Sequence, residues 1–389
     1  MGAVSEARFV AAGCGDSVSD VVADSVSGMV TGAAADSAAG AAADAVAVAV
    51  DGGGSKTDVL AVSMGGQVLA SVQGPGSSPQ AAGVAASIGT ITALIAEAVA
   101  RAGALPVTRI GVYLSGLDFP DEHTTFAATF RRATREAYPA AAVSIDNDLF
   151  ALLRAGTRES DAVAVVCGTG MNCVGVRADG AQVRYPALGT LSGDWGGGWH
   201  LGEQALWHAA RALDGRGPKT TLLQRIPAAL GAPQLCDVIE ALHVGRLESV
   251  RLADLSPVVF SAADDADAVA LSLVDRQAAE IVALAVNTLR RLDLVQRPVP
   301  VVLGGGLIRA GHTRLMRSIE RDLASAAPAA RLTVVRRSPV FGAALLVLEA
   351  AGADDTALVR LGDSTQRVGS CDPAEPTDYA WAKGPVGSR

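Results

Sequence analysis

The feature that most limits the possible folds is a strand pattern that occurs twice in the chain. Residues 46–50, 58–63 and 68–72 are short apolar runs, and turns that contain glycine separate them. From residue 161, the stretch "DAVAVVCGTGMNCVGVRADGAQVRYPALG" repeats the order of strand, glycine-rich turn, strand, Asp-Gly turn and strand. The two copies lie a domain's length apart, so we interpret them as a duplicated domain and not as a short solenoid repeat. The expected fold is α/β, with two similar domains that face each other across a ligand cleft.

The segments around these copies complete the predicted domain organisation. Helices are expected at about 80–102, 201–214 and 265–292, and helix content should exceed strand content. Residues 1–44 consist mainly of small and polar residues, which bury too little area to offset their ordering entropy. The predicted segments are a low-complexity, disordered extension (1–44), a first domain (45–147), a second domain (148–338), a helix that packs back on the first domain (339–352) and a flexible tail (364–389).

Composition and charge restrict the partners that this chain can have. Its 389 residues are 50% apolar and carry a formal net charge of -8, so nucleic acid and anionic membranes would not be attracted to it. The five cysteines are scattered without a CxxC pair, which favours reduced thiols over a disulfide framework or a zinc site. No apolar run approaches the roughly 20 residues that a membrane helix needs. We expect a cytoplasmic protein that binds small molecules, and a homodimer is left open.

The turn "DGGGSKT" is a candidate phosphate-binding site. A P-loop needs glycine directly before its lysine and a helix after it, whereas Ser55 precedes Lys56 and a strand follows, so a P-loop is excluded. Glycines without side chains expose backbone N–H groups that can bind phosphate oxygens, and Asp51 could hold Mg²⁺. A plain hairpin turn is the alternative, and this turn alone does not decide between them. The second glycine turn, at 168–170, favours phosphate binding because it repeats the arrangement.

Five motifs in order, "DGGGSK", "LSGLD", "CGTGMN", "GDWGGGW" and "LGGGLIRAG", resemble the N-acetylglucosamine kinase group of the BadF/BadG/BcrA/BcrD ATPase family. The resemblance covers roughly residues 46–350 and implies two actin-like (RNase H-like) domains with ATP and a sugar in the cleft between them. It implies a sugar kinase that uses ATP and Mg²⁺, in which Asp118 is the catalytic base that orients the acceptor hydroxyl and takes its proton. Asp51 would be the metal ligand. The implied ATP contacts are Gly52, Gly53, Gly54, Ser55, Lys56, Gly168, Thr169, Gly170, Gly304, Gly305 and Gly306.

The same resemblance implies a sugar pocket. Carboxylates pair well with sugar hydroxyls, and a tryptophan can stack on the apolar face of a pyranose. Ser78 stands where the family usually has asparagine, and Trp195 follows the acid of the fourth motif where the family usually has glutamate. N-acetylglucosamine, through its 6-hydroxyl, is therefore the first candidate acceptor, with glucosamine and other amino sugars as alternatives. The implied sugar contacts are Ser77, Ser78, Asp118, Asp148, Asp194 and Trp195, whereas Trp207 is predicted to be a core residue.

Two other functions remain open from the sequence. An ATPase that activates a partner redox enzyme would need cysteines that bind an iron–sulfur cluster at a dimer interface. Cys167 and Cys173 lie beside the second glycine turn, where we interpret them as small buried apolar residues. A sensor that binds a sugar without catalysis is the other alternative. Asp118 and the two glycine turns favour an enzyme over this sensor. We find no basic helix-turn-helix pattern before residue 46, which argues against a DNA-bound repressor.

Overall fold

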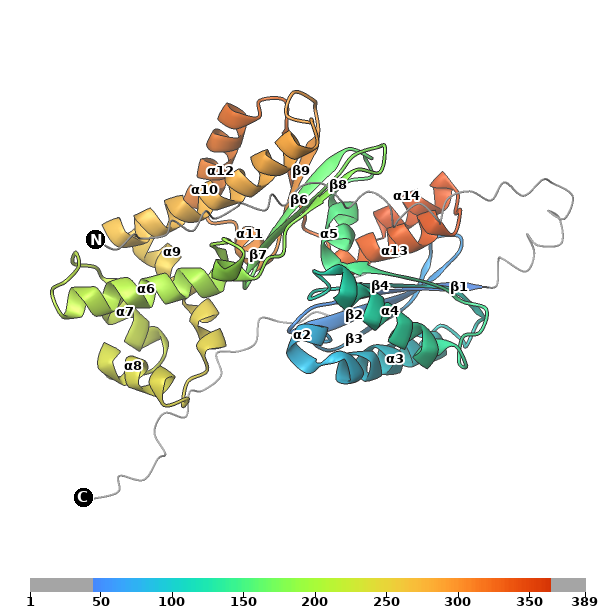
Figure 1. Ribbon diagram of the computed structural model, residues 1–389, viewed down its shortest axis with the longest axis horizontal. Coiled ribbons are helices and arrows are strands. Elements are labelled where there is room, and N and C mark those ends of the chain that lie inside the picture. The colour runs from blue at the N-terminus through green and yellow to red at the C-terminus, as the bar shows by residue number, and fades with distance from the viewer. Residues whose placement is uncertain (1–44, 365–389) are drawn as a thin grey trace, which may run out of the picture. The chain divides into compact units, whose positions relative to one another are not determined.

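The computed structural model describes residues 45–364, and within them two five-stranded sheets have the same strand order (Figure 1). The first sheet has the order β3-β2-β1-β4-β5, and the second has the equivalent order β8-β7-β6-β9-β10. In each sheet the first three strands pair antiparallel, and the last two continue the sheet in parallel pairs. The predicted duplication and α/β class are thus confirmed. The cleft stays a prediction, and the extension (1–44) and the tail (364–389), apart from Ser364, lie outside the described residues.

The first sheet has two different faces because successive side chains of a strand point to opposite sides. Its strands are β1 (Val46–Gly52), β2 (Lys56–Ser63), β3 (Val68–Pro75), β4 (Val107–Leu114) and β5 (Ala142–Asn147). The valines of β1 belong to the core formed with α3 (Val84–Arg101) and α4 (Pro120–Thr134). Ala47 and Ala49 point to the other face, towards α5 (Asp148–Gly156) and α13 (Pro339–Ala350).

Helix α3, which follows the short helix α2 (Pro79–Ala82), has an apolar composition that its packing explains. Among the described helices it is long and apolar enough to cross a membrane. Ile91 and Ile95, however, are fully buried in the core of the first sheet. This helix therefore has the properties of a core helix.

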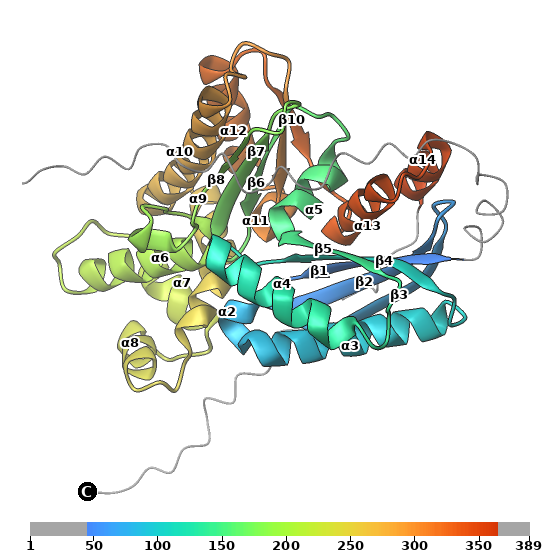
Figure 2. The same cartoon turned by 45° about the vertical axis from the view of Figure 1, so that its right-hand side comes forward.

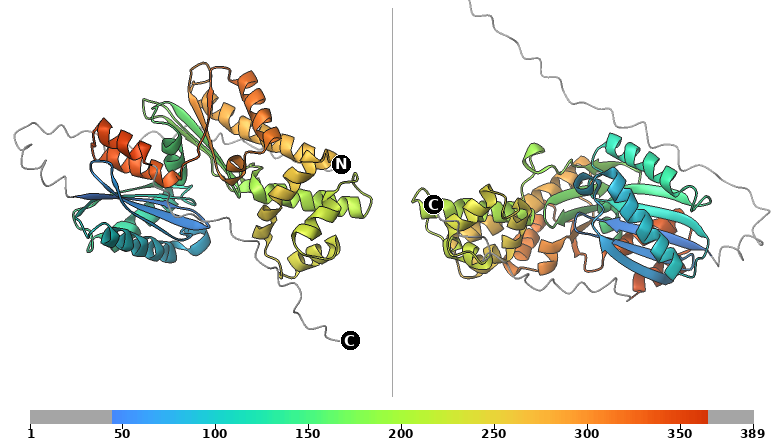
Figure 3. Two further views of the ribbon diagram at one scale, coloured as in Figure 1. Left: turned by 180° about the vertical axis from the view of Figure 1, so that it is seen from behind. Right: turned by 90° about the horizontal axis from the view of Figure 1, so that it is seen from below.

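The second sheet carries most of the remaining helices. Its strands are β6 (Ala162–Cys167), β7 (Met171–Val176), β8 (Gln182–Arg184), β9 (Pro300–Gly304) and β10 (Arg331–Val334). The long helices α10 (Ala268–Arg291) and α12 (Thr313–Ala326) cover one face of it (Figure 3). The other helices are α6 (Gly197–Leu213), α7 (Leu222–Ala229), α8 (Leu235–His243), α9 (Ser256–Asp264), α11 (Gly306–Ala310) and α14 (Asp355–Asp363), with 3₁₀ helices η1 (Gly189–Leu191) and η2 (Ser249–Leu255).

One core cluster contains residues of both sheets. Ala164 and Val302 of the second sheet belong to it together with Ala49 of the first sheet. Helices α5 and α13 contribute the larger side chains of this cluster, and both are visible beside the two sheets in Figure 2. Helix α13 packs on β1, β2 and β4 although it follows the second sheet in sequence. The chain therefore returns to the first sheet after completing the second.

The prediction that Trp207 is a core residue is wrong. Its side chain is 49% exposed, and the guanidinium carbon of Arg211 lies 4.6 Å from its ring centroid. Leu201, Ala205 and Ala209 form the buried face of α6. Trp207 lies outside that face, because the helical period places buried residues three or four positions apart.

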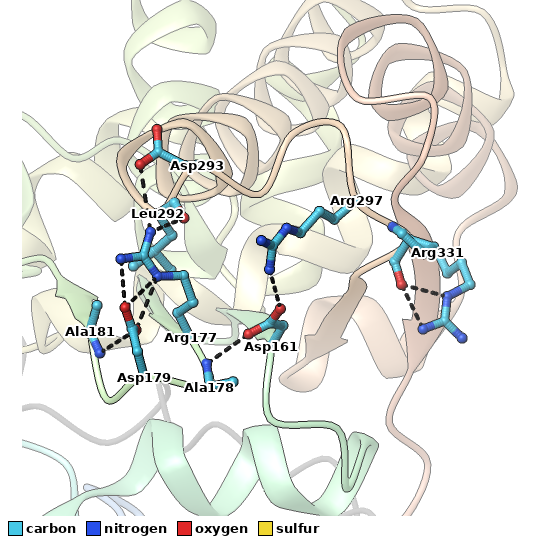
Figure 4. A network of polar contacts seen from close by, with 10 residues as sticks. Asp161, Arg177, Ala178, Asp179, Ala181, Leu292, Asp293, Arg297 and Arg331 are labelled. Atoms are coloured by element: carbon cyan, nitrogen blue, oxygen red, sulfur yellow. Dashed lines mark hydrogen bonds and ion pairs between the residues drawn. The ribbon is translucent and has the colours of Figure 1, made fainter.

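A polar network closes the end of the second sheet that is opposite the glycine turns (Figure 4). Asp161, just before β6, accepts hydrogen bonds from the Ala178 backbone N–H at 2.7 Å and from Arg297 at 3.1 Å. Arg177 pairs with Asp179 and donates to the Leu292 carbonyl at 2.9 Å. These contacts fix the turn between β7 and β8. Since these ion pairs are mostly exposed, each contributes little to the stability of the protein. Their residues are therefore suitable sites for control substitutions.

Candidate functional site

The first glycine turn leaves two backbone N–H groups free for a ligand. The Gly53 N–H donates to the Lys56 carbonyl at 2.9 Å, and the Gly53 carbonyl accepts from the N–H groups of Ser77 and Ser78. Within the described part of the chain, the N–H groups of Gly54 and Ser55 have no hydrogen-bond acceptor. A side chain added at Gly54 would meet nothing within 4 Å. The turn therefore presents unpaired donors to open space, which is what a phosphate oxygen requires.

The Ser77 side chain lies beside Gly52 at the start of this turn. A Cβ atom at Gly52 would lie 2.4 Å from the Ser77 hydroxyl, and the Thr57 hydroxyl donates to the same oxygen at 2.7 Å. Ser77 has no exposed surface, whereas Ser78 keeps 6%. In this structure the predicted sugar contact at Ser77 is therefore a supporting position, and Ser78 is the serine of the pair that retains some surface.

Lys56, predicted as an ATP contact, is held by a buried aspartate. Its ammonium lies 2.6 Å from Asp58, which has no exposed surface and also accepts from Gln73 and Ser338. Asp58 stands directly opposite Asp51 in the β1–β2 register. The sequence analysis missed Asp58, although an acid at an inward position of an apolar strand could have indicated it.

The second and third glycine turns lie against each other. A Cβ atom at Gly305, whose φ is +97°, would lie 2.2 Å from the Cys167 carbonyl oxygen. A Cβ atom at Gly168 would lie 3.8 Å from the Gly306 nitrogen. Positions Gly170 and Gly306 face open space, with nothing within 4 Å of an added Cβ. The structure therefore brings the turns 168–170 and 304–306 together.

The start of α6 completes the second turn. The Gly198 N–H donates to the Gly168 carbonyl at 2.8 Å, and the Trp199 N–H donates to the Thr169 carbonyl at 2.9 Å. Within the described residues, the N–H groups of Thr169 and Gly170 have no acceptor. Both glycine turns of the duplicated pattern thus leave two adjacent donors unpaired.

Asp118 is held beside the first glycine turn by neutral donors. Gln80 donates to one of its carboxylate oxygens at 3.2 Å, and Asn147 donates to the other at 3.1 Å. The loop that carries it is tied to the turn, because the Ser115 N–H donates to the Gly52 carbonyl at 2.9 Å. Burial raises the pKa of Asp118, and the Glu122 carboxylate adds to this, while Arg184 and the two amide donors lower it. The sequence analysis missed Gln80 and Asn147, whose roles depend on tertiary contacts.

Asp51 and Asp148 form an acidic region near Asp118. Burial, with the charges of Asp148 and Asp58, raises the pKa of Asp51 well above its ordinary value. Burial and the charge of Asp118 raise the pKa of Asp148 to about 7. Asp51 also interacts with the charge of Arg309 on α11, which follows the third glycine turn. The first turn, the acids and the third turn therefore share one electrostatic environment.

Asp194 and Trp195 lie in the loop that leads into α6. Asp194 accepts a hydrogen bond from the Ser192 hydroxyl. Trp195 is 8% exposed, and the Arg276 guanidinium carbon lies 4.1 Å from its ring centroid. Among the described residues, no hydrogen bond or ion pair joins Asp194 or Trp195 to Asp118. Their predicted sugar contacts stay predictions, and for Trp195 the covered ring leaves little surface for stacking.

The cysteines beside the second turn are buried, as predicted. Cys167 and Cys173 have no exposed surface, and burial raises the pKa of each thiol to about 12. Thiols in this state are poor ligands for an iron–sulfur cluster, since the thiolate is the ligand.

We expect iodoacetamide at pH 8 to label the exposed Cys236 of the folded protein and to leave Cys167 and Cys173 unlabelled in a peptide map. Rapid labelling of Cys167 would contradict the buried position.

A family model and several known proteins match most of this chain. The model of the BadF/BadG/BcrA/BcrD ATPase family matches residues 48–347. The chain is 27% identical over 315 residues to the N-acetyl-D-glucosamine kinase of Dictyostelium discoideum, covering 78% of this chain and 98% of that protein. It is 24% identical over 302 residues to the N-acetylmuramic acid/N-acetylglucosamine kinase of Clostridium acetobutylicum, covering 77% and 97%. A solved Chromobacterium violaceum structure, described as a candidate N-acetylglucosamine kinase, has a TM-score of 0.62 at 26% identity and covers 78% and 98%.

Proposed function

Because the chain belongs to the BadF/BadG/BcrA/BcrD ATPase family, we propose that it is a kinase that transfers the γ-phosphate of ATP to a hydroxyl of an amino sugar. N-acetylglucosamine is the first candidate acceptor because both relatives are named for it. The 6-hydroxyl is the position that we expect to receive the phosphate. The observation that carries the proposal is Asp118, a carboxylate with one amide donor on each oxygen, on a loop tied to the first glycine turn. The cytoplasm, which supplies ATP, is the expected location.

Different residues would bind the phosphates, contact the adenosine and act as the base. The free N–H groups of Gly54, Ser55, Thr169 and Gly170 would bind phosphate oxygens, and the third turn would contact adenosine. Asp118 would orient the acceptor hydroxyl in line with the γ-phosphorus and accept its proton. The acceptor O–H bond would break as its oxygen bonds to the γ-phosphorus, and the bond from the γ-phosphorus to the β–γ bridging oxygen would break to release ADP. Asp148, Asp194 and Ser78 remain the candidate partners of the other sugar hydroxyls.

Asp51 is the residue that we propose as the Mg²⁺ ligand. It is a hard oxygen donor whose pKa is raised by burial and by neighbouring carboxylates, so its charge lacks full compensation within the protein. A divalent cation would relieve this repulsion. When bound with ATP, Mg²⁺ would neutralise part of the phosphate charge.

Mg²⁺ is expected to stabilise the protein more at pH 8 than at pH 5. The raised pKa values of Asp51 and Asp148 mean that the protein without metal loses stability as pH rises from about 4, the unfolded value, through the folded values. Mg²⁺ binds the ionised form, so its effect on Tm should grow over the same window and disappear in Asp51→Asn. Asp179→Asn, in the turn of Figure 4, is the matched control. An unchanged Mg²⁺ effect in Asp51→Asn would contradict the assignment.

A coupled assay of ADP release tests the proposed function. The panel contains N-acetylglucosamine, N-acetylmuramic acid, glucosamine and glucose, each with Mg·ATP. We expect turnover to depend on an amino sugar and to be strongest with one or two members of the panel. ATP hydrolysis at the same rate with and without every sugar would contradict the proposal.

A further inference from the structure

Arg184 is an arginine of the second sheet whose guanidinium reaches the segments around Asp118. It is the last residue of β8, and its backbone is fixed opposite Val174 of β7. One of its terminal nitrogens donates to the Leu117 carbonyl at 2.7 Å. Leu117 directly precedes Asp118, so this hydrogen bond joins the second sheet to the loop that carries the proposed base.

The same guanidinium contacts two further segments. Its other terminal nitrogen lies 3.8 Å from the Asp146 carboxylate at the end of β5, and its carbon lies 5.8 Å from the Phe150 ring centroid on α5. The Arg184 side chain is 33% exposed. It therefore meets the loop after β4, the end of β5 and the start of α5 at once, which a planar group with five donors can do.

These contacts connect the two parts that a phosphoryl transfer must align. The candidate phosphate and adenosine turns at 168–170 and 304–306 follow strands β6 and β9 of the second sheet, whereas Asp118 lies in the loop after β4 of the first. In-line transfer is sensitive to the placement of the base relative to the phosphate. The hydrogen bond from Arg184 on β8 to the Leu117 carbonyl links the second sheet to the residue before the proposed base.

We propose that Arg184 is a positioning residue for the phosphoryl transfer, which holds the Leu117–Asp118 segment against the second sheet and places a positive charge beside the acids. This proposal rests on the proposed function. The charged groups around Asp118 are Glu122 from α4, Asp148 from α5 and Arg184 from β8. Gln80 and Asn147 complete its surroundings as neutral donors.

The charge of Arg184 predicts a pH effect that a purely structural cross-link would not produce. Removing the guanidinium takes away a group that favours ionised Asp118. The base would then stay protonated to higher pH, and the acidic limb of kcat/KM would move upward. Loss of a neighbouring opposite charge typically raises the pKa of a carboxylate by about one unit or more.

The test compares Arg184→Gln and Arg184→Lys with the wild-type chain by pH profiles of sugar-dependent ADP release. In Arg184→Gln, the apparent pKa of the acidic limb of the kcat/KM profile should rise by about one unit, and kcat should fall about tenfold. In Arg184→Lys, this apparent pKa should stay near its wild-type value. Arg177→Gln, an exchange in the turn before β8, is the control and should change neither quantity.

Other outcomes would contradict either the role of Arg184 or the proposed function. A wild-type limb and kcat in Arg184→Gln, or an acidic limb that moves equally in the Gln and Lys variants, would overturn the proposal, as would an Arg184→Gln chain that fails to fold. Wild-type protein without sugar-dependent turnover would contradict the proposed function itself, and the Arg184 proposal with it.

Discussion

Replacing Asp118 with asparagine is expected to lower kcat by about 10² to 10⁴, with the affinity for ATP retained. Asparagine has the shape of aspartate but cannot accept the proton of the acceptor hydroxyl. Gln80 and Asn147 each donate to Asp118, so one of the two donors would face the new amide group. That change affects the acceptor side of the site and leaves the glycine turns intact. Single-turnover kinetics with a sugar, together with calorimetric ATP binding, would separate the two effects.

Asp121→Asn is the matched control for this variant. Asp121 is an exposed carboxylate in the first turn of α4. Its removal should leave kcat within about twofold, since exposed substitutions outside a site have small effects. If Asp118→Asn kept wild-type turnover, Asp118 would not be the base.

The second large effect is expected from Gly305→Ala. The φ of +97° and the Cys167 carbonyl oxygen 2.2 Å from an added Cβ both oppose a side chain there. Backbone strain alone costs about 1–3 kcal/mol, and the backbone must also move to relieve the contact. We expect a clear loss of Tm and a weaker affinity for ATP, because the second and third turns would separate. Thermal melts and ATP titrations measure these two quantities.

The neighbouring Gly306→Ala exchange should leave the stability unchanged and weaken only the interaction with ATP. An added Cβ there meets nothing within 4 Å, so stability should change by less than about 0.5 kcal/mol. If adenosine lies against this glycine, however, the methyl group enters its space. Overpacking of about 1.4 kcal/mol would raise the KM for ATP about tenfold. A stable Gly305→Ala chain, or wild-type ATP kinetics in Gly306→Ala, would contradict the assignment of the third turn.

The sequence predicted the fold well because the information was local. The first and second glycine turns each lie between two short apolar runs, so the duplication could be recognised in the sequence before the structure. Trp207 was misplaced because its apolar character outweighed its position on α6, where the helical period directs it away from the core. The helix at 339–352 was predicted to pack back on the first domain, and helical periodicity alone could not have indicated this packing.

The site was less predictable because its support comes from distant segments. Gln80 and Asn147 converge on Asp118 from different elements, and Arg184 reaches the carbonyl of the preceding Leu117 from the other sheet. No spacing in the sequence encodes these contacts. Ser77 was assigned to the sugar from its motif, yet the fold uses its hydroxyl to support the Gly52 position.

The most direct test of the central claim is ³¹P nuclear magnetic resonance of the products formed from ATP and N-acetylglucosamine. We expect ADP and a sugar phosphomonoester in equal amounts, with the phosphate on the 6-hydroxyl, and about 10² to 10⁴ times slower product formation in Asp118→Asn. If ADP accumulated with inorganic phosphate and without a phosphorylated sugar, the chain would be an ATPase and not an amino-sugar kinase.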